Sequence, residues 1–158
     1  MMKTARKKRK TIRPAVAVVM GSERDRPVMA PAADLLGEFG VGCELVVLSA
    51  HRSPTALARY ARAAAGRGVK IIIAGAGLSA ALPGAIASHT QLPVIGVPLA
   101  VKELNGLDAL LCMAQMPTGV PVATVAIGNA RNAALLALRI LALGSARLAR
   151  RLRGRGNR

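Results

Sequence analysis

The sequence predicts an α/β protein in which helices cover both faces of a parallel sheet, as a three-layer α/β/α sandwich. Short runs of apolar residues alternate with longer helix-like runs along most of the 158 residues. Five such pairs occur, and strands that alternate with helices are typical of parallel sheets. The length is that of one domain.

Each predicted strand is a short, almost wholly apolar run. The run at residues 15–20 is apolar and β-branched, so we expect this strand to be buried. The predicted strands are residues 15–20, 44–49, 69–74, 93–97 and 121–127.

A helix-like segment follows each strand. Pro27 lies near the start of the first, where a missing N–H costs little, and Ser53 precedes the second as an expected N-cap. The predicted helices are residues 26–39, 54–65, 79–89, 103–115 and 129–143, the last continuing into the basic C-terminal residues. Five such units in about 130 residues predict a flavodoxin-like, doubly wound sheet.

The net charge of +16 is concentrated at the two ends of the chain. Residues 3–13 carry seven Lys or Arg, residues 145–158 carry six Arg, and neither segment contains an acid. We therefore predict a basic N-terminal tail (1–13), a central domain (14–144) and a basic C-terminal extension (145–158). We expect both ends to be solvated, with a possible nonspecific attraction for RNA or other polyanions.

Apolar residues make up 53% of the chain, yet Phe39 and Tyr60 are its only aromatic residues. A surplus of apolar surface on a small domain predicts a homo-oligomer. Cys43 and Cys112 form no disulfide framework, which favours the reduced cytoplasm. No segment has the length and apolarity of a membrane span, and the N-terminus lacks the pattern of a signal peptide.

Polar residues follow the predicted strands, where doubly wound sheets bind their ligands. The segment 21–25 follows the first strand, 49–53 the second, Gly75-Ala76-Gly77 the third and Pro98 the fourth. We expect all four segments to line one rim of the sheet.

His51 is the predicted proton-transfer residue of this rim. Histidine accepts and donates protons near neutral pH, and His51 follows the second strand directly. The other histidine, His89, is expected to be a surface residue at the end of a helix. Arg52 offers a planar fork of donors that suits phosphate or carboxylate, although a surface arginine fits its position equally well.

Four further rim residues have two interpretations each. Ser22 and Asp25 could bind an anion and sugar hydroxyls, or they could cap the first helix. Gly75 and Gly77 would allow a ligand to approach the backbone, although Gly-Ala-Gly is common in α/β loops.

Several other chemistries lack their motifs. The sequence has no P-loop, no G-x-S-x-G elbow and no metal-ligand cluster, and Ala80 stands where the strict dinucleotide fingerprint has glycine, although that position also accepts alanine. The rim thus offers one proton carrier and anion-binding groups, with no cofactor site.

Six segments resemble the N5-carboxyaminoimidazole ribonucleotide mutases, in family order over residues 14–144. They are MGSERD (20–25), SAHRSP (49–54), AGAGLSAALPG (74–84), PVIGVP (93–98), QMPTGVPVATVAIG (115–128) and NAALLALRIL (132–141). The resemblance implies a flavodoxin-like homo-octamer of purine biosynthesis that uses neither a metal nor an organic cofactor.

The resemblance also implies a reaction and its residues. The substrate's carboxylate moves from an exocyclic nitrogen to ring carbon four, by decarboxylation and recarboxylation with the same carbon dioxide. His51 would protonate the departing nitrogen and later remove the proton from carbon four. Ser22, Asp25 and Arg52 match substrate-binding positions, and Ser49 with the backbone at Gly75–Gly77 would complete the pocket.

The chain departs from the family pattern at Ala81, where many members have histidine. The stretch GLSAALPG around Ala81 leans toward the relatives that carboxylate aminoimidazole ribonucleotide with free carbon dioxide, which read more like G-x-SNAL-x-G there. Those relatives, however, tend to have Lys at the position of Arg52 and Cys-Pro-Pro at 96–98. Two of three markers therefore favour the mutase, and such a carboxylase is the first alternative. A non-catalytic nucleotide- or RNA-binding protein is a remote one, because no aromatic residues support base stacking.

Overall fold

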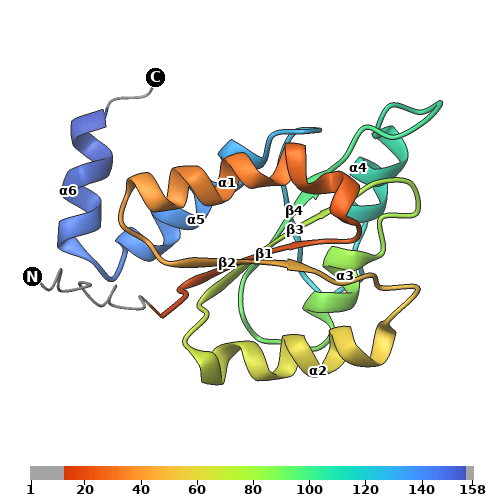
Figure 1. Cartoon of the computed structure of the whole chain (residues 1–158), viewed down its shortest axis with the longest axis horizontal. Helices are drawn as coiled ribbons and strands as arrows, with labels where there is room; N and C mark the ends of the chain where they lie inside the picture. Colours follow the sequence, from red (N-terminus) through yellow and green to blue (C-terminus); the bar gives the residue numbers. More distant parts are fainter. Residues whose placement is uncertain (1–12, 156–158) are drawn as a thin grey trace, which may run out of the picture.

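In the computed structural model, which describes residues 13–155, five parallel strands form one sheet in the order β2-β1-β3-β4-β5 (Figure 1). The strands are β1 (Val16–Met20), β2 (Cys43–Val47), β3 (Ile71–Ala76), β4 (Val94–Pro98) and β5 (Ala123–Thr124). This order is that of the flavodoxin-like fold, with its topological switch between β1 and β3. The predicted fold class is therefore confirmed.

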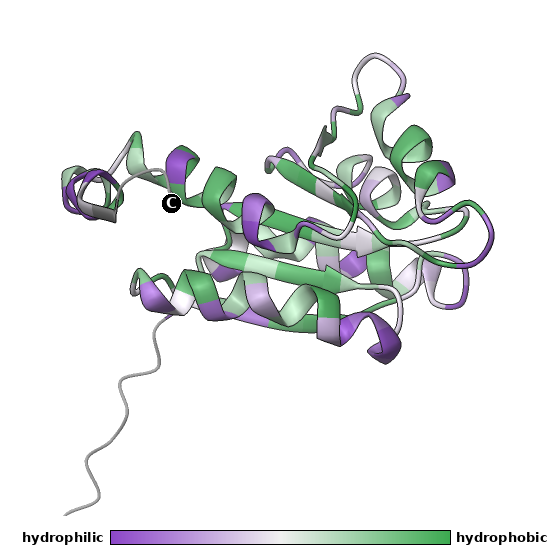
Figure 2. Ribbon diagram, turned by 90° about the horizontal axis from the view of Figure 1, so that it is seen from above, coloured by the Kyte–Doolittle hydropathy of each residue, from purple (hydrophilic) through white to green (hydrophobic). Residues whose placement is uncertain are grey.

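Helices cover both faces of the sheet (Figure 1), and the strands between them are coloured mainly as hydrophobic (Figure 2). The helices are the 3₁₀ turn η1 (Glu23–Asp25), α1 (Arg26–Glu38), α2 (Pro54–Ala64), η2 (Ala65–Arg67), α3 (Leu82–Ala87), α4 (Leu107–Ala114), α5 (Ala130–Ala142) and α6 (Ala146–Arg155). Among residues 13–155, no helix has the length and apolarity to cross a membrane.

Strand β1, which lies between β2 and β3, is fully buried and contributes side chains to both cores. Val16, Val18 and Met20 point to the face that α1 and α5 cover, and Ala17 and Val19 point to the face of α2, α3 and α4. This alternation follows from the two-residue period of a strand. Since both faces need apolar side chains, the strand has no polar residue, as its sequence indicated.

The third strand lies two residues later than predicted. Gly75 pairs with Val97 and Ala76 with Pro98, so both belong to β3, and the glycine-rich turn begins only at Gly77. The prediction was wrong because Gly75 was interpreted as part of a turn.

Two helices start later than predicted, and the fifth strand is shorter. Leu78 and Ala80 have φ of 53° and 39°, and Gly106 has φ of 89°, so right-handed helix cannot form across them. The segment 79–81 is therefore a loop before α3, and 103–106 is a loop before α4. The segment predicted as the strand 121–127 pairs with β4 only at Ala123 and Thr124.

The predicted continuation of the last helix into the basic extension is wrong. The chain turns after α5, at Gly144 and Ser145, and a separate helix α6 follows. The Ser145 hydroxyl accepts a hydrogen bond from the amide of Leu148 at 3.3 Å, which caps α6.

The C-terminal extension is not simply solvated, contrary to the prediction. Leu148 on α6 is buried in the core that α1 and α5 share. Arg151 donates hydrogen bonds to the carbonyl oxygens of Glu38 and Phe39, both at 2.9 Å, and its guanidinium lies 5.8 Å from the centre of the Phe39 ring. These carbonyls end α1, where a cation is favourable. The N-terminal tail, apart from Arg13, lies outside the described residues.

Candidate active site

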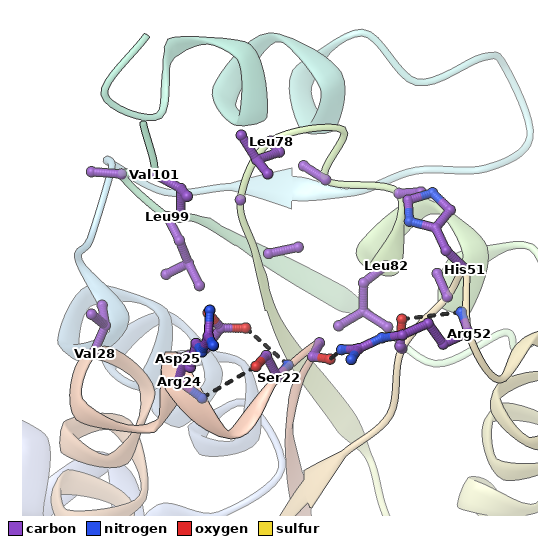
Figure 3. Close-up of a pocket in the computed structure, with 18 residues that line it drawn as sticks. Ser22, Arg24, Asp25, Val28, His51, Arg52, Leu78, Leu82, Leu99 and Val101 are labelled. Atoms are coloured by element: carbon purple, nitrogen blue, oxygen red, sulfur yellow. Dashed lines mark hydrogen bonds between the residues drawn. The ribbon is translucent and has the colours of Figure 1, made fainter. Parts of the chain in front are cut away.

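A cavity of ≈ 580 Å³ lies at the carboxyl ends of β1, β2, β3 and β4, beside the topological switch (Figure 3). Loops that follow all four strands line it. Ser22, Asp25, Ser49, His51, Arg52 and Gly77 are among the lining residues, so the structure brings together six of the seven predicted site residues. The seventh, Gly75, does not line the cavity.

The loop after β1 folds through reciprocal hydrogen bonds between Ser22 and η1. The Ser22 hydroxyl accepts from the amide of Arg24 at 3.3 Å, and the Ser22 amide donates to Oδ2 of Asp25 at 3.0 Å. This is a capping box, so the capping interpretation of Ser22 is correct. Both residues also border the cavity.

The Asp25 carboxyl has a raised pKa. Burial raises it above the ordinary value of 3.8, although hydrogen bonds from the amides of Ser22 and Gly21 and the positive charge of Arg52 act in the opposite direction. Asp25 is therefore a carboxylate of the cavity wall that is only partly solvated.

The loop after β2 presents His51. The Ser49 hydroxyl accepts from the amide of Arg52 at 3.2 Å, and the Ser49 carbonyl accepts from the amide of Ser53 at 3.0 Å. These bonds curl the loop so that His51 is exposed beside the cavity. Within residues 13–155 its imidazole makes no hydrogen bond. Ser53 precedes α2 but makes no side-chain cap, contrary to the prediction.

Arg52 joins the first two loops. Its Nη2 donates to the carbonyl oxygen of Gly21 at 3.0 Å, which leaves its other donors for a ligand. Figure 3 shows His51 and Arg52 at one side of the cavity and Arg24 and Asp25 at the other, with Ser22 between them.

The two predicted glycines serve different purposes. A Cβ at Gly75 would lie 2.3 Å from Sδ of Met29, so this glycine makes room for a buried side chain of α1. A Cβ at Gly77 would lie 2.5 Å from Cγ2 of Val101, which shows that the loops after β3 and β4 pack closely at the cavity.

Sequence reasoning missed the apolar wall of the cavity. Val28, Leu78, Leu82, Leu99 and Val101 line it together with Ala81. The predicted rim consisted of polar residues and glycines, and it included none of these apolar side chains. Their position in the sequence could have indicated this role, since Leu99 comes directly after the carboxyl end of β4 and Leu78 follows β3 after Gly77 alone.

Arg24 lies at the cavity, and His89 does not. Arg24 lines the cavity, although sequence analysis assigned it no role. His89 follows α3, is half-buried and does not line the cavity, as a helix-end histidine would be. The cavity thus combines one imidazole, two guanidiniums, one carboxylate and two hydroxyls against an apolar wall. Such a set can hold an anionic ligand and move a proton on it.

The sequence profile of the AIR carboxylase family matches residues 15–158, which is most of the chain. The chain belongs to this family. The profile includes α6 as well as the sheet, and the resemblance seen in the sequence motifs is thereby confirmed.

Curated relatives in the family carry the name N5-carboxyaminoimidazole ribonucleotide mutase. The chain is 57% identical to that of Pyrococcus horikoshii over 144 residues, covering 91% of this chain and 81% of the relative. It is 56% identical to that of Mycobacterium tuberculosis over 140 residues, covering 89% and 80%.

A solved structure of a PurE protein has the same fold as this chain. The crystal structure of Treponema denticola PurE superimposes with a TM-score of 0.81 at 29% identity, covering 90% of this chain and 89% of that one. The sheet and its helices are therefore shared nearly from end to end.

Proposed function

We propose that this protein converts N5-carboxyaminoimidazole ribonucleotide to 4-carboxy-5-aminoimidazole ribonucleotide in purine biosynthesis. The observation that carries the proposal is the cavity at the switch point, which combines His51 with Arg24, Arg52 and Asp25. Relatives at 57% and 56% identity are named as mutases of this substrate, which supports the same reaction here.

His51 is the general acid and base of the proposed reaction. The imidazolium protonates the exocyclic nitrogen as its bond to the carboxylate breaks, which releases carbon dioxide and leaves neutral imidazole. Carbon four then attacks the retained carbon dioxide, and the imidazole removes the proton that this carbon carried. The atoms balance as an isomerisation, and His51 ends in its starting state. Its exposed position beside the cavity supports this role.

The other site residues bind and orient the substrate in this proposal. Arg52 attracts the anionic substrate with the donors that Gly21 does not occupy. Asp25 accepts hydrogen bonds from ribose hydroxyls, and the hydroxyls of Ser22 and Ser49 contribute donors. Gly77 lets the backbone approach the ligand. The apolar wall limits the entry of water while carbon dioxide is free.

One observation keeps a carboxylase with free carbon dioxide as a second candidate. Ala81 lines the cavity at the position where the resemblance leads us to expect histidine. A small apolar side chain there changes the wall that would retain carbon dioxide. Fold, cavity and His51 are common to both candidates, so substrate preference alone separates them.

The test is a direct assay with two substrates. One is N5-carboxyaminoimidazole ribonucleotide, and the other is aminoimidazole ribonucleotide with dissolved carbon dioxide. We expect the wild type to turn over the first substrate alone and His51→Asn to turn over neither. Binding of the product by His51→Asn would show that the cavity of the variant is intact. Efficient turnover of the second reassigns the protein to the carboxylases. Failure with both substrates contradicts the proposal.

We also propose a homo-octamer in the cytoplasm. Leu107 and Leu111, four residues apart on α4, and Leu104 just before it are 50%, 47% and 58% exposed, which supports contact with other subunits. Native mass spectrometry should find eight chains, and Leu107→Glu with Leu111→Glu should yield smaller species.

For the proposed location, the fluorescence of a tagged chain in cells should fill the cytoplasm.

The basic ends give a weak and nonspecific affinity for polyanions in this proposal. The residues Arg147, Arg150 and Arg153 are exposed on α6. Binding to a homopolymeric RNA should weaken steeply as salt increases and should not depend on base sequence. A variant without residues 1–12 should bind less RNA and keep its enzymatic activity.

A further inference from the structure

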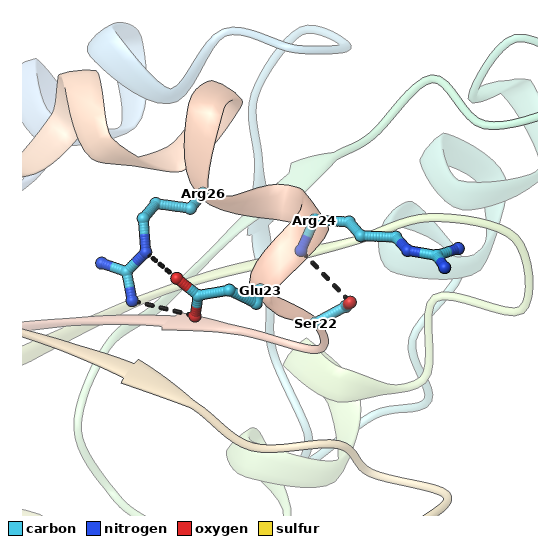
Figure 4. Close-up of polar contacts among 4 residues, drawn as sticks. All are labelled: Ser22, Glu23, Arg24 and Arg26. Atoms are coloured by element: carbon cyan, nitrogen blue, oxygen red, sulfur yellow. Dashed lines mark hydrogen bonds and ion pairs between the residues drawn. The ribbon is translucent and has the colours of Figure 1, made fainter.

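Three loops that border the cavity are held in place in different ways. The loop after β1 closes on itself, since the amide of Arg24 donates to the Ser22 hydroxyl (Figure 4). The loop after β2 is tied to the loop after β1 by Arg52. The loop after β3, residues 77–81, makes no hydrogen bond within residues 13–155 through any side chain of its own. Its conformation therefore depends on contacts from other parts of the chain.

The loop 77–81 needs such support because its backbone is strained. Leu78 and Ala80 have φ of 53° and 39°, values at which an ordinary side chain crowds the backbone. One backbone hydrogen bond inside the loop, from the amide of Ala80 to the carbonyl oxygen of Gly77 at 3.1 Å, supports the turn. Strained residues persist only where the surrounding structure holds them, and they are concentrated at functional sites.

The thiol of Cys112 holds this loop from α4. It donates to the carbonyl oxygen of Ser79, with Sγ 3.0 Å from the oxygen, across 33 positions of sequence. Within residues 13–155 this is the only hydrogen bond between a side chain and the loop. Ser79 is also the one residue of the loop that does not line the cavity. The bond therefore holds the loop without occupying the surface that faces a ligand.

Helix α4 gives the thiol a firm support. Ala109 and Met113, which lie three residues before and one residue after Cys112, are buried in the core on the face of the sheet that α2, α3 and α4 cover. Ala80 and Leu82 belong to the same core. Apolar packing thus brings the loop and the helix together, and the hydrogen bond adds a directional contact between them.

The loop supplies part of the apolar wall of the cavity. Leu78 and Ala81 belong to this wall, and Figure 3 shows Leu78 across the cavity from Ser22 and Asp25. The Leu78 side chain is 42% exposed, so burial does not fix its position. Its position is set by the backbone of the loop, and hence by the contact that holds Ser79.

We propose that Cys112 is a positioning residue, whose hydrogen bond to Ser79 keeps the apolar wall closed while carbon dioxide is free in the proposed reaction. This inference rests on the proposed function and deepens it. Cys112 does not line the cavity, so it acts only through the loop.

A loop that loses this hydrogen bond should let carbon dioxide escape after the carbon–nitrogen bond has broken. The exocyclic nitrogen then keeps the proton that His51 gave it, and the imidazole of His51 takes up a proton from water. The enzyme releases aminoimidazole ribonucleotide in place of its carboxylated isomer. The share of consumed substrate that leaves in this form, the escaping fraction, therefore reports how well the wall retains carbon dioxide.

The experiment measures the escaping fraction with N5-carboxyaminoimidazole ribonucleotide as substrate, after subtraction of the spontaneous decay seen without enzyme. Cys112→Ala removes the donor, and alanine has the higher helix propensity, so α4 should stay folded. We expect this variant to raise the escaping fraction roughly threefold to tenfold with little change in KM. Cys112→Ser keeps a donor at the same position and should give nearly the wild-type fraction.

The matched control is Cys43→Ala, which removes the other thiol of the chain at a position outside the cavity. It should leave the escaping fraction unchanged. Amide hydrogen exchange provides a second measurement, because a loosened loop opens its internal hydrogen bond more often. The Ala80 amide should exchange faster in Cys112→Ala than in the wild type or in Cys112→Ser.

The inference and the proposed function fail separately in these measurements. The inference is overturned if Cys112→Ala has the escaping fraction of the wild type, if Cys112→Ser has that of Cys112→Ala, or if the Ala80 amide exchanges equally fast in all three proteins. A wild type that does not convert N5-carboxyaminoimidazole ribonucleotide contradicts the proposed function, and the inference falls with it. Wild-type activity therefore distinguishes the two failures.

Discussion

The guanidinium of Arg52 donates a hydrogen bond to the carbonyl oxygen of Gly21 over 3.0 Å, across 31 positions of sequence. It ties the loop that carries His51 to the loop that carries Ser22 and Asp25. One side chain thus fixes two walls of the cavity relative to each other and still has donors for a ligand.

Replacement of Arg52 should therefore impair catalysis more than folding. We expect Arg52→Gln to lower kcat/KM at least about tenfold, because both the tether and a substrate cation are lost. Because Arg52 is exposed, the free energy of unfolding should fall by only about 1 kcal/mol. Arg59→Gln, at an exposed position of α2 outside the cavity, is the matched control. Steady-state kinetics and urea unfolding give both quantities. Equal kcat/KM for wild type and Arg52→Gln would contradict the expectation.

Gly75→Ala should destabilise the protein by about 1–3 kcal/mol. The new methyl group would lie 2.3 Å from Sδ of Met29, which is itself fully buried, so Met29 or the strand must move. Gly37→Ala is the opposite case, since Gly37 lies in α1 and nothing lies within 4 Å of its added Cβ. It should increase stability by about 0.5–1 kcal/mol. Chemical denaturation of both variants checks the pair, and a stabilising Gly75→Ala would show that the strand tolerates the methyl group.

Asp25 should make stability depend on pH. Burial raises the pKa of its carboxyl above 3.8 in the folded protein, so folding favours the protonated form. The stabilisation of the folded state by this preference is fully present below about pH 3.8, and it is lost as pH rises through the folded pKa. Asp25→Asn cannot ionise and keeps an acceptor for the Ser22 amide. Its free energy of unfolding relative to the wild type should therefore increase between about pH 3 and pH 7. Urea unfolding at both pH values tests the sign, and a decreasing difference would refute the raised pKa.

Tyr60 should resist ionisation in the folded protein. Burial raises its pKa well above the ordinary 10, and its hydrogen bond of 2.6 Å to the Glu44 carboxylate raises it further. Arg67, which pairs with Glu44 at 2.9 Å and lies over the Tyr60 ring, acts in the opposite direction. The chain has one tyrosine and no tryptophan, so absorbance near 295 nm reports this group alone.

The phenolate signal should accordingly appear only when alkali unfolds the protein. Because the folded pKa is raised, the stability from this group is present below about pH 10 and is lost as pH rises above it. Glu44→Gln should lower the pKa of Tyr60, and Tyr60→Phe should give no signal. Titration of the folded wild type at the ordinary pKa of a free phenol would disprove the prediction.

The sequence predicted the sheet and most of the rim because both depend on local patterns. Apolar runs mark β1 to β4, and the loops that follow β1 and β2 carry polar residues such as Ser22 and His51. The places where prediction failed depend on distant partners. Gly75 belongs to a strand because it pairs with Val97 and adjoins Met29, and no local signal distinguishes this from a turn.

The apolar wall and α6 were missed for the same reason. Leu78 and Val101 acquire their role only when the loops after β3 and β4 come together at the cavity. Arg151 looked like one charge in a basic extension, and its partners are carbonyl oxygens more than a hundred positions earlier. Charge patterning cannot reveal a backbone acceptor in another helix.

The contact of Arg151 with the end of α1 has a consequence for protein synthesis. The arginine that binds the carbonyl groups of Glu38 and Phe39 is translated more than a hundred residues after them. The final packing of the first helix must therefore wait until Arg151 has emerged from the ribosome. A nascent chain that stops before α6 exposes the apolar surface that Leu148 covers, and such truncated products are natural substrates for chaperones and proteases.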